Sequence, residues 1–134
     1  MKSLAKGQFS VKLYPEPVHA SAEAALGRRS ISKTYEGDLA GTAIGEMLMA
    51  GGAVAGSAGY VAIERVEGML GGKSGSFHLQ HFGLMTRGEG VLTIKVIPDS
   101  GTRELGGLAG DLIIHIEPGG AHFYEFSYEL PDQL

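Results

Sequence analysis

The chain contains no cysteine. This absence excludes a disulfide framework and any thiolate chemistry, whether for catalysis or for metal binding. Long apolar runs are missing as well, because no window approaches the roughly 18 apolar residues of a membrane helix. The first residues also contain no apolar stretch of signal-peptide length. We therefore expect a cytoplasmic protein that has no membrane as a partner.

Basic residues are few and scattered. Lys and Arg number 11 against 15 Asp and Glu, for a net charge of −4, and only Arg28 and Arg29 are adjacent. Nucleic acid is therefore not an expected partner, because phosphate binding needs a basic surface. Glycine, by contrast, makes up 22 of the 134 residues, more than twice its usual share of about 7 %. Abundant turns and short strands would explain this excess.

A length of 134 residues suits one domain, over 1–134, and is too short for two. The hydrophobic period is two residues rather than 3.6, as in the alternation of Phe9, Val11 and Leu13. Only 20–26 has helical propensity, enough for at most one short helical segment. Eight strands with turn signals between most of them predict an all-β sandwich or barrel with antiparallel neighbours. The first strand is the one that contains Phe9, Val11 and Leu13. The other seven strands are predicted at 29–36, 42–50, 60–66, 76–82, 90–97, 111–116 and 122–130.

The segment from Glu64 to Gly83 is predicted to form a β-hairpin whose register follows from its turn. Two residues at 71–72, both glycine, can form a two-residue turn, which pairs Glu64 with Leu79 and Ala62 with His81. Side chains alternate between faces, and we expect the more apolar face to be buried. That face carries Tyr60, Ala62, Glu64, Val66, Phe77, Leu79 and His81, and the other face carries Val61, Ile63, Arg65, His78 and Gln80.

The next hairpin predicts the same buried side. A two-residue turn at Arg87 and Gly88 pairs His81 with Ile94 and Leu79 with Val96, so the apolar face continues into a third strand. On the opposite face Gln80 meets Lys95, which suits solvent or a subunit interface. A one-residue bulge in either turn would invert the assignment.

Glu64 and His81 are then diagonal neighbours on an apolar face. A carboxylate and an imidazole in such a place can exchange protons with a substrate, or they can satisfy each other as part of the architecture. His78 points to the other face, so it cannot share a metal with His81. His115 and His122 would lie opposite one another if 117–120 is a four-residue loop, but they lack a third ligand, and we expect no metal and no cofactor.

A stripe of aromatic residues lies near the C-terminus. His122, Tyr124, Phe126 and Tyr128 share one face of a predicted strand. The tyrosine hydroxyls could face a ligand in a barrel lumen, or the stripe could be core. No nucleotide-binding motif accompanies it. Gly-Gly-Lys-Ser at 71–74 matches the end of a phosphate-binding loop, but the first glycine of that motif would fall at position 67, which is Glu67.

Several motifs together resemble a bacterial family called domain of unknown function 3224. They are Tyr-Glu-Gly-Asp-Leu-Ala-Gly-Thr at 35–42, Glu-Arg-Val-Glu-Gly at 64–68, Gly-Ser-Phe-His-Leu-Gln-His-Phe-Gly at 75–83, and 96–110 with Pro-Asp-Ser-Gly-Thr at its centre. The resemblance runs from about Gly7 to Leu130, and it departs from the family at Arg103, where glycine is usual. It implies an eight-stranded antiparallel up-and-down β-barrel similar to allene oxide cyclase and the dirigent proteins.

The resemblance implies function only in outline, because one fold hosts many activities. Allene oxide cyclase and dirigent proteins hold a hydrophobic substrate in the barrel and form oligomers, so we expect a homo-oligomer. The favoured hypothesis is a lumen that binds a small apolar or amphipathic ligand. An isomerase or cyclase with a lumenal Glu-His pair, and an assembly barrel with a side-chain-filled lumen, stay open. No residue is assigned as catalytic, and the candidate lumen residues are Glu64, His81, Tyr60, Phe77, Leu79 and Tyr124.

Overall fold

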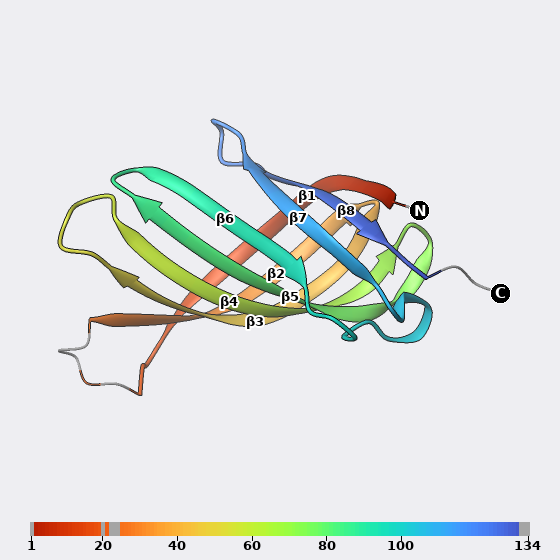
Figure 1. The fold of residues 1–134 in the computed structure, drawn as a ribbon, viewed down its shortest axis with the longest axis horizontal. Helices are drawn as coiled ribbons and strands as arrows, with labels where there is room; N and C mark the ends of the chain where they lie inside the picture. The colour runs from red at the N-terminus through yellow and green to blue at the C-terminus, as the bar shows by residue number, and fades with distance from the viewer. Residues whose placement is uncertain (1, 20, 22–24, 132–134) are drawn as a thin grey trace.

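Eight antiparallel strands close into a barrel in which each strand pairs with its neighbour in sequence and β8 pairs with β1 (Figure 1). The computed structural model describes residues 2–19, 21 and 25–131. The predicted all-β, eight-stranded antiparallel up-and-down barrel is confirmed. The strands are β1 Lys2–Glu16, β2 Leu26–Gly37, β3 Leu39–Gly51, β4 Ala58–Leu70, β5 Lys73–Thr86, β6 Glu89–Val96, β7 Ala109–Ile116 and β8 His122–Glu129.

Helical structure is minimal. Within the described residues the one helical element is a 3-10 turn, η2, at Arg103–Leu105. The short segment predicted at 20–26 falls mostly outside the described residues, and its last residue, Leu26, begins β2. In the described part of the chain no helix has the length and apolar character needed to cross a membrane.

The two hairpin registers derived from the sequence are confirmed. Glu64 pairs with Leu79 and Ala62 with His81 across β4 and β5, and His81 pairs with Ile94 across β5 and β6. Both turns place two residues at positive φ, including the non-glycine Arg87 at 48°. Such turns match the twist of the strands they join, and they fix which side chains face inward.

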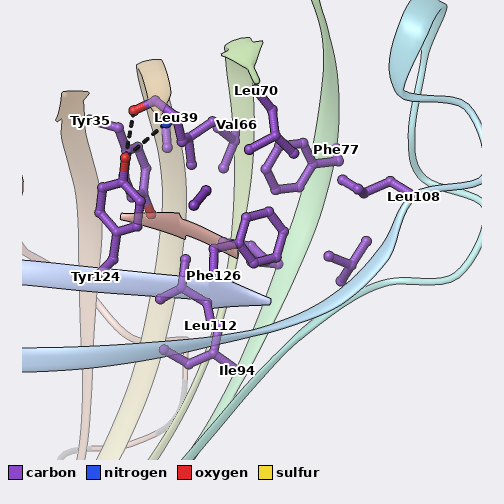
Figure 2. Close-up of a cluster of buried hydrophobic side chains, with 14 of the residues drawn as sticks. Tyr35, Leu39, Val66, Leu70, Phe77, Ile94, Leu108, Leu112, Tyr124 and Phe126 are labelled. Carbon is purple, nitrogen blue, oxygen red and sulfur yellow. Dashed lines mark hydrogen bonds between the residues drawn. The ribbon is translucent and has the colours of Figure 1, made fainter. Parts of the chain in front are cut away.

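One end of the barrel, the packed end, is filled by inward-facing side chains (Figure 2). It is the end with the β2–β3 and β4–β5 turns. Phe77 of β5 and Phe126 of β8 stack there with ring centroids 5.8 Å apart, and both are at most 1 % exposed. Full burial of each such side chain stabilises the fold by roughly 1.5–3 kcal/mol. Leu39, Val66 and Leu70 belong to the same core cluster.

The connection from β6 to β7 covers the packed end. Its residues Leu105 and Leu108 are buried in the core cluster. The loop is fastened to β5 by Thr102, whose Oγ1 accepts a 3.0 Å hydrogen bond from the Ser76 amide, and by Ser100, whose Oγ accepts one of 3.0 Å from the His78 amide. The β6–β7 connection therefore closes this end of the barrel.

The seam between β6 and β7 is the weakest ladder in the barrel. Within the described residues it consists of one pair, Lys95 with Asp111, whereas every other ladder runs for at least eight pairs. Their side chains form an exposed ion pair of 3.0 Å. From this point the β5–β6 and β7–β8 hairpins diverge toward tips that stand apart (Figure 1).

Candidate functional site

A buried polar cluster lies halfway along the lumen. Glu64 Oε2 lies 2.7 Å from Lys33 Nζ and 2.7 Å from His81 Nε2, and the Tyr35 hydroxyl donates to Glu64 Oε1. Strand β2 supplies Lys33 and Tyr35, while β4 and β5 supply the other two. Within the described residues every buried side-chain nitrogen and oxygen has a hydrogen-bond partner, so the cluster is complete in itself.

The electrostatics of the cluster keep Glu64 ionised. Burial opposes its ionisation, but the hydrogen bond from His81 and the charge of Lys33 outweigh burial and lower the pKa of Glu64 to about 2. An ionised carboxylate only accepts, so His81 donates through Nε2. Burial and the neighbouring Glu64 raise the pKa of Tyr35 well above its ordinary value, so its hydroxyl stays a donor. Lys33 also lies over the Phe9 ring, 4.9 Å from the centroid.

A glycine makes room for the carboxylate. Gly45 of β3 pairs with Glu64, and a Cβ at position 45 would lie 2.2 Å from the Ile63 carbonyl oxygen and 3.0 Å from Glu64 Cβ. On β3, Ala43 pairs with Lys33 and Gly45 pairs with Glu64. Because both positions are small, Lys33 can reach across β3 to the carboxylate. The bare backbone at Gly45 is thus part of the site.

The cluster marks the boundary between two unlike halves of the lumen. On one side are Val66, Phe77 and Leu79, which are at most 1 % exposed. On the other side, the inward-facing positions of β1 and β6 include Leu13 and Leu92, which are 39 % and 42 % exposed. This second half, called here the open half, ends at the β3–β4, β5–β6 and β7–β8 hairpins. Its inward-facing side chains include Met47, Met49, Tyr60 and Ile114, all half-buried.

The candidate lumen residues divide between these halves. Glu64 and His81 lie together in the cluster, as the register requires. Tyr60 lies in the open half, with its ring against Gly83, where a Cβ would lie 2.4 Å from the ring carbon Cε1. Phe77 and Leu79 lie in the packed half. Three of the six candidates, Glu64, His81 and Tyr60, therefore lie in the cluster or in the open half.

Tyr124, the sixth candidate, fastens the packed end (Figure 2). Its hydroxyl oxygen accepts a 2.9 Å hydrogen bond from the Leu39 amide and lies 2.9 Å from the Glu36 carbonyl oxygen, to which it can donate. These bonds tie β8 to the β2–β3 turn. The side chain is 1 % exposed and lies in the packed half.

Sequence reasoning missed the two partners from β2. Lys33 and Tyr35 complete the bonding of Glu64, and nothing local in the sequence places β2 beside the hairpin. A signal was nevertheless present: in the stretch 31–35 the inward-facing phase reads Ile31, Lys33, Tyr35. A lysine in phase with large apolar residues indicates a buried cation, which requires a partner.

The expected pairing of His115 with His122 is wrong. The loop after β7 has five residues, 117–121, so Ile116 pairs with His122 and His115 with Phe123. His115 Nε2 instead lies 2.8 Å from Glu125 Oε2 on the outer surface. Among the described residues no group of three or more His, Cys, Asp or Glu side chains could hold a metal ion.

Comparison with known proteins identifies the family. The model of a protein family of unknown function, DUF3224, matches residues 5–128. The chain belongs to this family. A crystal structure of a DUF3224 protein of unknown function from Shewanella oneidensis MR-1 superposes with a TM-score of 0.93 and 49 % sequence identity, covering 99 % of this chain and 100 % of that one. Comparison with curated proteins gave no match.

Membership of DUF3224 confirms the family inferred from the motifs at 35–42, 64–68, 75–83 and 96–110. The likeness to allene oxide cyclase and the dirigent proteins stays a prediction. Neither finding names a ligand or a reaction for the family.

Proposed function

We propose that this DUF3224 protein binds a small apolar or amphipathic ligand in the open half of its lumen. The observation that carries the proposal is the exposure of large apolar side chains on the inward phase of the strands, Leu13 at 39 % and Leu92 at 42 %. Inward positions of a filled barrel are buried. Apolar surface that is left open inside a concave wall supports an exchangeable occupant.

The floor of the proposed site supplies polar anchors. His81 and Lys33 are 4 % and 6 % exposed at the boundary, whereas Glu64 behind them is fully buried. A mostly apolar wall with a few convergent polar groups is typical of small-molecule sites. The ligand's apolar part would pack on Met47, Met49 and Ile114, and its polar part would lie toward the floor or the mouth.

The alternative as an isomerase or cyclase has less support. Glu64 accepts hydrogen bonds from three donors and has no exposed surface, so a proton would have to pass through His81 or Tyr35. General acid–base catalysis needs a group within hydrogen-bond reach of the substrate. The side-chain-filled alternative accounts for the packed half and leaves the exposed inward residues of the open half unexplained.

The proposal is tested with a tryptophan that fills the open half. Met47→Trp adds a large ring at an inward, half-buried position of β3, and Thr42→Trp adds the same ring at an exposed outward position of that strand. We expect Nile red to gain fluorescence with the wild-type protein and with Thr42→Trp, but not with Met47→Trp. Native mass spectrometry of freshly purified protein would then give the mass of any retained ligand.

Two outcomes decide the matter. Equal enhancement by Met47→Trp and wild type would place the dye elsewhere and refute the proposal, as would the lack of enhancement by the wild-type protein. Circular dichroism melting of both variants confirms that the barrel is folded when the dye is tested.

A further inference from the structure

We infer that the ligand of the open half carries an anionic head group, such as a carboxylate; this inference rests on the proposed function. From the cluster to the open end, the charged residues on the inward phase of the strands are Arg29, Lys33 and Glu64. Two cations thus stand against one carboxylate, in a chain whose net charge is −4. The two histidines on the same phase, His81 and His122, can only add positive charge.

Arg29 is the inward-facing cation that is not bound to Glu64. Lys33 is already bound to Glu64 at 2.7 Å. Arg29 shares the inward phase of β2 with Lys33, lies nearer the open end and is half-buried. Among the described residues it has no ion-pair partner, whereas its outward neighbour Arg28 donates to Glu46 Oε1 at 2.7 Å.

The chemistry of a guanidinium indicates the class of ligand. Arginine binds carboxylates through two parallel hydrogen bonds, and it is preferred where such pairs are partly shielded from water. A half-buried guanidinium beside apolar wall residues such as Met47, its pairing neighbour on β3, suits a molecule with one anionic end and an apolar body. A ligand with a cationic end would be repelled by the surplus positive charge.

Three molecules with the same alkyl chain and different heads test the inference. Octanoate, octanol and octylamine are titrated into the full-length protein by isothermal calorimetry. We expect octanoate to bind about tenfold more tightly than octanol, the effect of one charge-assisted contact, and octylamine to bind most weakly. Arg29→Gln should remove the preference for octanoate, and the matched variant Arg28→Gln, on the other face, should keep it.

The outcomes separate the two proposals. If octanol binds as tightly as octanoate, the anionic head group is refuted and the apolar site stands. If none of the three binds, the proposed function itself fails. If Arg28→Gln removes the preference as completely as Arg29→Gln, the anion is held on the outer surface, which also overturns the inference.

A second, independent observation concerns the outer face of β3 to β6, called here the outer apolar face. We propose that it is the interface with a second copy of this chain. Large apolar side chains lie together on it, each between 47 % and 68 % exposed. Contiguous apolar surface of this kind marks a protein contact. The residues are Ile44, Leu48, Val61, Ile63, Phe82, Leu84 and Val91.

Rows of outward-facing residues cross this face from β3 to β6, and the two ends of a row complement each other. A row therefore fits the same row of a second copy that runs in the opposite direction. One row reads Ala50, Gly59, Leu84, Val91, with small residues at the β3 end and large ones at the β6 end. Another row reads Glu46, Ile63, Gln80, Lys95, with an acid at the β3 end and a base at the β6 end. A two-fold axis along the strands reverses each row against itself. Val91 then meets Ala50 of the other copy, and Lys95 meets its Glu46.

The shape of the face fits the same arrangement. A groove of about 1160 Å³ runs over the outer surface from the end of β1 to β5, and Leu48 and Val61 line it. Leu84 and Val91 do not line it and stand beside it on β5 and β6. In the two-fold arrangement, the ridge formed by Leu84 and Val91 of each copy packs against the groove of the other copy. Both ridges are then buried in the same interface. The exposed ion pairs Arg28–Glu46 and Lys95–Asp111 then form the polar rim.

Sedimentation equilibrium tests the interface. We expect the wild type to be a dimer, Val91→Glu to be a monomer, and Ile113→Glu, an exposed apolar residue on the outer side of β7, to remain a dimer. Lys95→Glu should weaken the dimer about tenfold by placing two acids together, and adding Glu46→Lys should restore it. A monomeric wild type, a trimer, or dissociation by Ile113→Glu alone would overturn the proposal.

Discussion

Lys33 of β2 and Glu64 of β4 form an ion pair of 2.7 Å across the intervening strand β3, and both side chains are buried. A buried pair of this kind is costly to break, because removal of one partner leaves an uncompensated charge. The pair also joins strands that are not neighbours in the barrel. It therefore fixes the inner geometry of the wall at the floor of the proposed site.

Replacement of Glu64 by glutamine should destabilise the barrel strongly. Glu64→Gln leaves Lys33 without its counter-charge, and we expect the free energy of unfolding to fall by about 3 kcal/mol. The matched variant Glu67→Gln, on the outer side of the same strand in an exposed pair with Arg103, should cost less than about 1 kcal/mol. Urea denaturation measures both. Equal losses would mean that the buried pair contributes no more than a surface pair.

The stability of the protein should depend on Glu64 in acid. Its pKa is lowered to about 2 in the folded state, so the folded protein binds fewer protons than the unfolded chain. The resulting stability is fully present above about pH 4.5 and is lost as the pH falls toward 2, a loss of about 3 kcal/mol. The difference in unfolding free energy between wild type and Glu64→Gln should shrink over this window. A constant difference would contradict the assignment.

The two histidines of β5 should respond differently to substitution. His81→Asn removes a donor to the buried carboxylate, and we expect a cost of about 1–3 kcal/mol because that hydrogen bond involves a charged group. His78 lies on the outer side of the strand, and His78→Asn should change stability by less than about 0.5 kcal/mol. Thermal denaturation at neutral pH distinguishes the two. A larger effect at His78 would show that the assignment of faces is wrong.

Gly83 should not tolerate a side chain. A Cβ there would lie 2.4 Å from Cε1 of Tyr60, so Gly83→Ala must displace the ring and should cost about 1–3 kcal/mol. At Gly90, also inward-facing, a Cβ would meet nothing within 4 Å, and Gly90→Ala should be close to neutral. Removing the ring with Tyr60→Val should recover part of the stability that Gly83→Ala loses. If it recovers none, the cost arises from the backbone and not from Tyr60.

Backbone amides along the seam between β6 and β7 should exchange their hydrogens faster than amides elsewhere in the barrel. Strands that lack a second hydrogen-bonded neighbour open at lower free energy than strands paired on both sides. Backbone amides in 89–94 and 112–116 that point toward the seam should exchange at least tenfold faster than those in the middle of β4, as measured by NMR. Uniform protection around the barrel would show that the seam closes in solution.

Much of the fold follows from local sequence. Two-residue turns at 71–72 and 87–88 fix their hairpins, because turn length sets register and register sets faces. The same reasoning fails at 117–121, where Gly120 takes a φ of +94° and a fifth residue shifts the pairing by one. Arg103, at the start of the 3-10 turn, adopts a φ of 52°, in the left-handed region that favours glycine.

The candidate site was only half predictable. Glu64 and His81 meet across one hairpin, so their contact follows from a short turn. Lys33 reaches Glu64 from another hairpin, and its position depends on the pairing of β3 with both β2 and β4. No turn specifies how a side chain from β2 crosses β3, because that depends on the curvature of the closed wall and on the small residue Gly45.

By itself the sequence of this protein determined the period of its strands, two hairpin registers and the side on which Glu64 and His81 lie, because these are properties of neighbouring residues. The tertiary structure alone decided that β1 pairs with β8, that Lys33 and Tyr35 complete the bonding of Glu64, and that the lumen is packed on one side of this cluster and open on the other. The physical reason is that closure of a barrel depends on contacts between distant segments, whose separation the local pattern does not encode.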